Sequence, residues 1–394
     1  MIRMLYIAHR IPFPPNKGDK IRSFNELKSF SKEYEIDLLT FVDYKSDLKY
    51  KQDLAEICSN IYVYKLHHIS GIVRSLLFFI FGKSLSEGFY YRHDVYTKIN
   101  SLLKKRNYKI IFCYSAQIAQ YVLRYEDRLR IMDFVDVDSD KWRQYGRQKK
   151  FPLNRVYYIE GQRLLNFEKA ISKKFLLSIF STEQERRIFR NSGASGNIIA
   201  INNGVDTEFF SPQHFPKENA LVFVGAMDYF PNIDAVQWFT DSVFLPLLRR
   251  RPDIKFYIVG SNPVHGVKKL ANLSPNIIVT GFVKDVRPYL ARSKMAVMPI
   301  RIARGIQNKI LEAMAMRIPV ILNEKLYKTL HPIDKRELFI YRDADDLLDI
   351  INNTIDNDSL LMEKGKLLRE YVKKNYNWNI NITTLKDRIS QLTN

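Results

Sequence analysis

The stretch Lys294-Met-Ala-Val-Met-Pro-Ile-Arg-Ile-Ala-Arg-Gly-Ile-Gln-Asn-Lys-Ile-Leu-Glu-Ala-Met-Ala-Met316 passes from an apolar run, through a loop with one glycine, into a segment of helical periodicity. It predicts a strand over Lys294–Met298 and a helix over Gln307–Met316. A helix that begins after a glycine-containing loop presents free N–H groups and the positive end of its dipole. That arrangement suits a diphosphate.

The polar residues of this stretch fit the same role. Arg301, Arg304 and Lys309 would add positive charge beside the loop. Glu312 cannot hold a phosphate, but it can accept hydrogen bonds from ribose hydroxyls. We expect the loop and first turn to contact the nucleotide through Gly305, Ile306, Gln307 and Asn308. An amphipathic helix with ordinary surface charges would explain the helix, but not three cations beside a loop glycine.

The rest of the chain alternates short apolar runs with longer helical segments. Strands are predicted at Met4–Ala8, Ile36–Phe41, Ile61–Lys65, Ile110–Tyr114, Arg130–Val135, Leu176–Ser181, Ile198–Ile201, Ala220–Val224, Lys255–Val259, Ile277–Thr280 and Pro319–Leu322. Helices are predicted at Lys20–Lys32, Tyr96–Lys105, Ala116–Tyr125, Leu153–Lys173, Glu183–Ser192, Asn232–Arg250, Asp343–Ile355 and Ser359–Lys374. This order predicts an α/β protein with parallel sheets covered on both faces, as two Rossmann-like doubly wound domains.

The length of 394 residues suits two domains of about 150–200 residues each. The turn-rich segment Asn202–Pro216 is the best boundary. We therefore predict a domain over residues 1–205, a second over 206–375, and a C-terminal helix over 376–394 that crosses back to the first domain. Tandem domains of this kind bind ligands in the cleft that both sheets face.

Three successive strands of the second domain end in glycine, at Gly225, Gly260 and Gly281. A glycine there lets the backbone approach a ligand closely. Together with the stretch quoted above they indicate a nucleotide crevice. Phe282 and Val283, directly after the last of these glycines, would hold the base by backbone hydrogen bonds, and nothing in the sequence fixes which base.

The composition narrows the class of partner. The net charge of +20 could serve a nucleic acid, an anionic membrane or a phosphorylated substrate, or reflect a general compositional bias. No basic-aromatic or zinc-finger pattern is present, so we expect no nucleic-acid partner. Two cysteines in unrelated contexts fit a reducing cytoplasm. We expect neither a signal peptide nor a transmembrane helix.

One segment sharpens the membrane interpretation. Ile69–Gly82 is strongly apolar and has basic residues around it, but it is too short to span a bilayer. It can lie in the interface of an anionic membrane, which would place the protein on the inner face of the plasma membrane. The alternative is a helix buried under the first sheet.

The loop Pro14–Ser23 follows the first strand and opens a helix. Gly18 at this turn can bring its N–H near a phosphate or the reacting part of a substrate. We expect the side chains that contact a substrate or a phosphate to be Lys17, Asp19, Lys20 and Ser23, with Arg22 as a further candidate. A solvated turn with lysines for solubility is the alternative.

Asp136-Val-Asp138 fits a pattern of paired carboxylates that hard cations prefer. The pattern is short and frequent by chance, and we predict no metal site. Asp136 and Asp138 follow a strand, where they could contact the hydroxyl groups of a substrate or act on it, with Asp138 as a candidate general base. Equally, Asp138 or Ser139 could cap a helix that contains Trp142.

Several segments carry a family resemblance. Gly305–Val320 resembles the sugar-donor segment of retaining GT-B glycosyltransferases of the group 1 type, also called family 4. Four further segments resemble a narrower branch, the sugar transferases of exosortase-linked exopolysaccharide systems, and these are His9–Ser23, Phe134–Trp142, Asn203–Pro212 and Val224–Val236. The similarity covers nearly the whole chain in order.

This resemblance implies transfer of a sugar from a UDP- or GDP-sugar to a saccharide or polyprenyl-linked acceptor, with retention and without a cofactor. The first domain would bind the acceptor, and Arg304, Lys309 and backbone N–H groups would stabilise the leaving diphosphate. Two departures matter: Arg304 stands where the family has a Glu that contacts the sugar, and Ala226 and Pro231 replace an Arg and a Lys. A non-hydrolysing nucleotide-sugar epimerase of the same architecture is the alternative.

Overall fold

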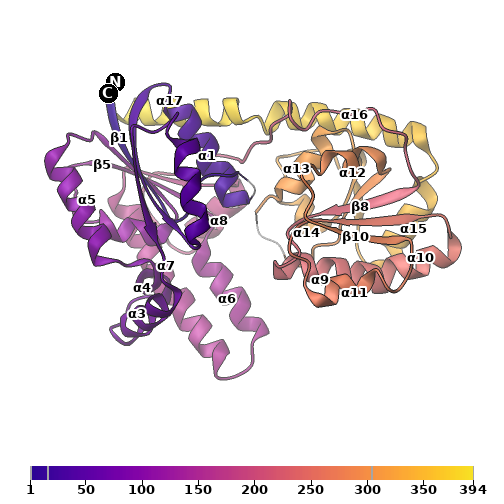
Figure 1. Ribbon diagram of the computed structural model, residues 1–394, viewed down its shortest axis with the longest axis horizontal. Coiled ribbons are helices and arrows are strands. Elements are labelled where there is room, and N and C mark those ends of the chain that lie inside the picture. The colour runs from indigo at the N-terminus through magenta and orange to yellow at the C-terminus, as the bar shows by residue number, and fades with distance from the viewer. Residues whose placement is uncertain (1, 16, 303–304, 394) are drawn as a thin grey trace. The chain divides into compact units, whose positions relative to one another are not determined.

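The apolar runs of the sequence form two parallel sheets, each in its own compact unit. The computed structural model describes residues 2–15, 17–302 and 305–393. Unit 1 extends to Asn202 and also includes the chain from Asn379 onward, and unit 2 extends from Asn203 to Trp378. Figure 1 shows helices on both faces of each sheet.

Unit 1 has a seven-stranded parallel sheet in the order β3-β2-β1-β4-β5-β6-β7. Its strands are β1 (Ile2–Ala8), β2 (Tyr34–Val42), β3 (Asn60–Lys65), β4 (Ile110–Tyr114), β5 (Leu129–Val135), β6 (Leu177–Phe180) and β7 (Ile198–Ala200). Its α-helices are α1 (Gly18–Phe30), α2 (Lys51–Leu54), α3 (His68–Ile80), α4 (Leu85–Tyr90), α5 (His93–Lys105), α6 (Asp138–Gln148), α7 (Leu153–Lys174), α8 (Glu183–Asn191) and most of α17 (Trp378–Thr393). Two 3-10 helices are η1 (Lys45–Tyr50) and η2 (Ala116–Tyr121).

Unit 2 has a six-stranded parallel sheet in the order β10-β9-β8-β11-β12-β13. Its strands are β8 (Ala220–Val224), β9 (Lys255–Val259), β10 (Ile277–Gly281), β11 (Met295–Met298), β12 (Val320–Asn323) and β13 (Phe339–Tyr341). Its helices are α9 (Phe230–Phe239), the π-helix η3 (Thr240–Phe244), α10 (Leu245–Arg250), α11 (His265–Leu270), α12 (Arg287–Arg292), α13 (Asn308–Ala315), α14 (Glu324–Tyr327), the 3-10 helix η4 (Lys335–Glu337), α15 (Ala344–Thr354) and α16 (Asp358–Asn375).

Strands this apolar are stable only where helices cover both faces of the sheet. Strand β4 is buried along its whole length, and so is β11. Phe134, Phe180 and Phe189 stack within the core of unit 1, with the first two rings 5.1 Å apart. The predicted class, α/β with a doubly wound sheet in each domain, is confirmed for each unit.

The exposure of helix α3 excludes one of the two interpretations of Ile69–Gly82, the buried helix. Ile69 is 83% exposed and Ile80 is 76% exposed, so the segment is not a helix buried under the first sheet. Across residues 2–15, 17–302 and 305–393, no helix combines the length and the apolar composition that crossing a membrane requires.

Candidate functional site

The chain order of the second sheet reverses between β8 and β11. Ligands of open α/β sheets bind at the carboxyl ends of the strands at such a reversal, because the flanking loops diverge there. The loops that follow β8 and β11 begin at Gly225 and Pro299. The stretch from which the nucleotide site was predicted therefore lies at the switch point of unit 2.

Glycines let three segments meet at this point. A Cβ on Gly260 would lie 1.7 Å from the carbonyl oxygen of Gly225, and a Cβ on Gly225 would lie 2.9 Å from Lys309 Nζ. The Gly225 N–H donates to Val259 O at 2.9 Å. Gly281 has a φ of +67° and open space around it. The first two glycines are thus required by close packing and the third by its left-handed backbone.

Lys309 carries the positive charge of the site. Its Nζ donates to Asn232 Oδ1 at 2.6 Å and lies 4.4 Å from the centroid of the Phe223 ring. Burial lowers the pKa of Lys309 to about 7, and the nearby Glu312 carboxylate opposes the shift. A neutral amide and a ring stabilise an ammonium only weakly, so this cation gains from an incoming anion.

Asn232 holds Lys309 in place, and the sequence analysis missed it. The Asn232 side chain is 4% exposed, and its Nδ2 donates to Ala226 O at 2.8 Å. It therefore ties the loop after β8 to the first turn of α13. The sequence did contain an indication of Asn232, because this polar residue directly follows Pro231 in the first turn of α9. Asparagine is common at helix starts for local reasons, which hid this role.

Glu312 lies one turn beyond Lys309 in α13. Burial raises the pKa of Glu312 to about 7, and the Lys309 ammonium opposes the rise. Within the described part of the chain, no hydrogen-bond donor contacts the Glu312 carboxylate. A partly buried carboxylate without donors gains from hydroxyl groups that a ligand brings.

The two arginines of the Lys294–Met316 stretch differ from Lys309. Arg301 pairs with Asp234 at 3.0 Å and lies 5.6 Å from the centroid of the Trp238 ring. Its charge is therefore balanced within the protein, and we correct its expected role at the phosphates. Arg304 falls outside the described residues. Gly305 is buried with a φ of 56°, and Ile306 is 7% exposed.

Helix α13 begins within one residue of the predicted start at Gln307. Gln307 is the N-cap of α13, with an extended backbone, and Asn308 is the first helical residue. Free N–H groups of such a first turn attract anions.

The segment after β10 leaves an aromatic side chain free. Phe282 is 76% exposed, whereas Val283 packs against the core of unit 2. Asp285 and Arg287 pair with each other at 2.7 Å, and Arg287 stacks 3.9 Å from the Phe209 ring. The two charged side chains that follow Val283 therefore neutralise each other.

Unit 1 has its own switch point, between β1 and β4. Lys17 and Gly18 are exposed at the start of α1. Burial alone would raise the pKa of Asp19, but hydrogen bonds from His9 and Arg10 outweigh it and lower that pKa. Arg10 Nη1 donates to Asp19 Oδ2 at 2.7 Å. Asp19 is thus held as an anion by neighbouring cations.

Three predicted contacts of α1 point inward instead. Arg22 is 1% exposed, donates through Nε to Asp133 Oδ2 at 2.7 Å, and donates through Nη1 to Ile201 O at 2.8 Å. Ser23 is also 1% exposed and donates to Asp19 O, and Lys20 is 7% exposed. Arg22 and Ser23 therefore secure helix α1, a placement that does not fit contact with an acceptor or a phosphate.

His9 is a second residue that sequence reasoning missed as a functional candidate. Its Nε2 lies 3.4 Å from Asp19 Oδ2, and its ring stacks on Tyr114 at 5.9 Å. Its Nδ1 is buried, with no hydrogen-bond partner in the part of the chain that the structure describes. A histidine oriented by a carboxylate, with its second nitrogen unused, is able to exchange a proton with a ligand.

Lys141 forms ion pairs with both Asp136 and Asp138. Its Nζ lies 3.0 Å from Asp136 Oδ2 and 2.9 Å from Asp138 Oδ1. The two carboxylates outweigh the effect of burial and raise the pKa of Lys141. Among the described side chains, no group of His, Cys, Asp and Glu is gathered as a metal would require. The pair is thus built around an internal ammonium.

The alternative of a helix cap at this position is wrong in detail. Helix α6 begins at Asp138 with Val137 as its N-cap, and no side chain caps it. Ser139 donates instead to Glu168 through both its N–H and its hydroxyl. Burial raises the pKa of Glu168 to about 8. These contacts fix α6 against α7.

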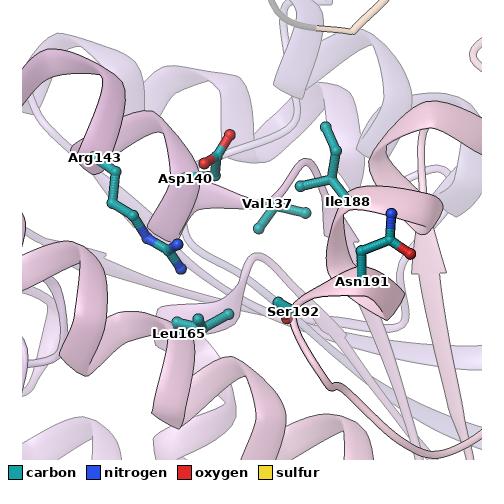
Figure 2. Close-up of a pocket in the computed structure, with 7 residues that line it drawn as sticks. All are labelled: Val137, Asp140, Arg143, Leu165, Ile188, Asn191 and Ser192. Atoms are coloured by element: carbon teal, nitrogen blue, oxygen red, sulfur yellow. The ribbon is translucent and has the colours of Figure 1, made fainter. Parts of the chain in front are cut away.

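A hollow of about 300 Å³ lies beside this network, between α6, α7 and α8. It is lined by Val137, Asp140, Arg143, Leu165, Ile188, Asn191 and Ser192 (Figure 2). The guanidinium of Arg143 extends from α6 towards it. All seven residues belong to unit 1.

The comparisons with known proteins agree with this geometry. Residues 218–357 match the family described as "Glycosyl transferases group 1". That range covers the second sheet from β8 to β13, including the switch point. No sequence among the curated proteins matches the chain.

Solved structures share the fold along the whole chain. Sucrose-phosphate synthase from Thermosynechococcus elongatus aligns with a TM-score of 0.71 at 16% identity, over 99% of both chains. HepE from Anabaena, solved with UDP, gives 0.71 at 13% identity over 99% of this chain and 100% of its own. TarM from S. aureus, solved with UDP and alpha-GlcNAc-glycerol among its ligands, gives 0.69 at 14% identity over 100% of both chains.

Proposed function

We propose that this protein is a glycosyltransferase of the group 1 type, and that it transfers a sugar from a UDP- or GDP-sugar to a saccharide or lipid-linked acceptor with retention. The observation that carries the proposal is Lys309 at the switch point of unit 2, a buried amine whose Nζ donates to the neutral Asn232 amide, lies near the Phe223 ring and is close to one carboxylate, Glu312, among the described side chains. The UDP complexes of HepE and TarM favour a uridine nucleotide.

The reaction separates a sugar from a diphosphate, and the negative charge of the leaving group must be stabilised. Lys309 and the first N–H groups of α13 would supply that stabilisation. Glu312 would hold the ribose, and the exposed ring of Phe282 would lie against the base. The described site offers no side chain suited to be a nucleophile, which favours front-face attack by the acceptor.

The proposal requires no metal. In many sugar-transfer enzymes a divalent cation neutralises the diphosphate, and here Lys309 does so. Asp136 and Asp138 already share Lys141, so a cation would have to displace an internal ion pair. An epimerase of the same architecture would not match a family of transferases, and it would need acid and base groups on both sides of the sugar.

The test measures nucleoside diphosphate released from a panel of UDP- and GDP-sugars, with and without saccharide acceptors and lipid extract. One sugar donor should release its nucleotide, and Lys309→Ala should abolish that release. Lys328→Ala, which alters a 66%-exposed lysine of the same unit, is the matched control and should retain full activity. The proposal fails if no sugar donor is bound or cleaved and Lys309→Ala leaves nucleotide affinity unchanged.

A further inference from the structure

Helix α3 packs on unit 1 through its small side chains. A Cβ on Gly71 would lie 3.0 Å from the Phe89 ring, and a Cβ on Gly88 of α4 would lie 2.7 Å from Ser75 Cα. The Ser75 hydroxyl donates to Leu85 O at 2.9 Å. The side of α3 that faces the protein thus carries Gly71, Ser75 and Phe78, whose ring packs 5.4 Å from that of Tyr91, and it leaves most of the large apolar side chains of the helix outside.

The large apolar side chains of α3 face outward. They are Ile69, Ile72, Val73, Leu76, Leu77 and Ile80, followed by Phe81 just beyond the helix, and each is about half exposed or more. At 100° per residue, the six helical positions span an arc of about 140°. An apolar face of this size, fixed by tight packing behind it, is a binding surface for an apolar phase.

Helices α6 and α7 form a hairpin that extends from the sheet of unit 1, with α3 and α4 beside it (Figure 1). Arg163 of α7 donates to Phe79 O and to Lys83 O, the latter at 3.1 Å, and stacks 4.3 Å from the Phe79 ring. Glu160 accepts hydrogen bonds from the first N–H groups of α4, at Leu85 and Ser86. The apolar face and the hairpin are thus one connected surface.

The hairpin is strongly basic. Ten Lys or Arg residues lie between Asp138 and Lys174, against four Asp or Glu residues. Arg143, Arg147 and Arg155 line a hollow of about 470 Å³ together with Tyr158 and Ile159. In the portion of the chain that the structure describes, none of these three arginines is in an ion pair. At the tip, Phe151 is 73% exposed.

We propose that the outward face of α3 and the α6–α7 hairpin bind an anionic membrane surface. The apolar side chains enter the boundary between headgroups and acyl chains, and Arg143, Arg147 and Arg155 hold lipid phosphates. Helix α3 has 13 residues, too few to cross a bilayer, so it lies in the plane of the interface. A second copy of this chain is a poorer occupant, because it would bring the same basic groups against themselves.

This surface belongs to unit 1 alone, so its test is independent of the sugar-donor site. The full-length protein is sedimented with phosphatidylcholine vesicles and with vesicles that contain about 30% phosphatidylglycerol. We expect binding at least about tenfold stronger to the anionic vesicles, falling with added salt. The double variant Leu76→Asp with Ile80→Asp should lose binding to both kinds of vesicle.

The triple variant Arg143→Gln, Arg147→Gln, Arg155→Gln should lose only the anionic preference. The control is Met362→Asp with Leu367→Asp, two exposed apolar residues of α16 in unit 2, and it should bind like the wild type. Circular dichroism and thermal unfolding check that each variant is folded. The proposal is overturned if the wild type does not bind vesicles, if folded α3 variants bind normally, or if light scattering shows that these variants only dissociate a dimer.

Discussion

Replacing Lys309 with methionine tests the sugar-donor site at its charged centre. The variant keeps the length of the side chain and its contact with the Phe223 ring, but removes the ammonium that donates to Asn232 at 2.6 Å. A hydrogen bond to a charged group contributes about 1.5–3 kcal/mol. A unit charge 4 Å from a phosphate contributes about 4 kcal/mol at an effective dielectric constant of 20, before desolvation is subtracted. We expect a net loss of about 2–3 kcal/mol.

That loss corresponds to a UDP dissociation constant weakened by about 30- to 140-fold, measured by titration calorimetry. Uridine, which lacks the diphosphate, should bind the variant and the wild type equally. Thermal unfolding should show only a small change, because the loss of the hydrogen bond to Asn232 and the removal of an ammonium that is unfavourable to bury act in opposite directions. A UDP affinity within about threefold of the wild type, or an equal loss for uridine, would refute the assignment of Lys309 to the diphosphate.

The Lys309 amine should also make the affinity for a UDP-sugar depend on pH. In the free protein the pKa of Lys309 is lowered to about 7, and a bound diphosphate stabilises the ammonium and raises that pKa. Binding therefore takes up a proton above pH 7, and affinity for a UDP-sugar should fall by up to about tenfold per pH unit there. Lys309→Met should abolish this alkaline decline. A decline that persists in the variant would mean that another group titrates.

Four further outcomes are expected. Asn232→Ala releases the Lys309 side chain and should weaken UDP binding about tenfold, and calorimetry that shows no change would remove Asn232 from the site. Glu312→Gln should weaken UDP by about tenfold but leave 2′,3′-dideoxy-UDP unaffected, and equal losses would exclude the ribose as its partner. Arg22→Met leaves Asp133 buried without a counter-ion and should lower the free energy of unfolding in urea by about 3–5 kcal/mol, whereas a loss below about 1 kcal/mol would show that the pair is not essential. Excess chelator should leave sugar transfer unchanged, and inactivation would reassign Asp136 and Asp138 to a metal.

Much of the fold follows from hydrophobic periodicity. The predicted strands Ile110–Tyr114, Ala220–Val224 and Lys255–Val259 agree with β4, β8 and β9 to the residue, because parallel buried strands are continuous apolar runs. The short strand β13 (Phe339–Tyr341) was missed, since three residues carry no period. The helix predicted at Ala116–Tyr125 is instead the 3-10 helix η2 (Ala116–Tyr121), which follows Ser115 at a φ of 78°.

The location of the candidate site was predictable, but its pairings were not. Sequence identifies a loop and a helix start beside cations, and the structure brings Lys309 to the switch point as expected. The sequence does not reveal that Arg301 pairs with Asp234, or that Arg22 is buried against Asp133, because in each pair the two residues are distant in the chain. Partner choice depends on which strands are neighbours, and that is a property of the sheet order.

The most direct test of the central claim is a crystal structure of the protein with a UDP-sugar. The account predicts the diphosphate within hydrogen-bond distance of Lys309 Nζ and the first N–H groups of α13, and the ribose hydroxyls on Glu312. It predicts the uracil beside Phe282 and Val283. A nucleotide bound away from Lys309 and α13, for example at the hollow beside Arg143, would contradict it.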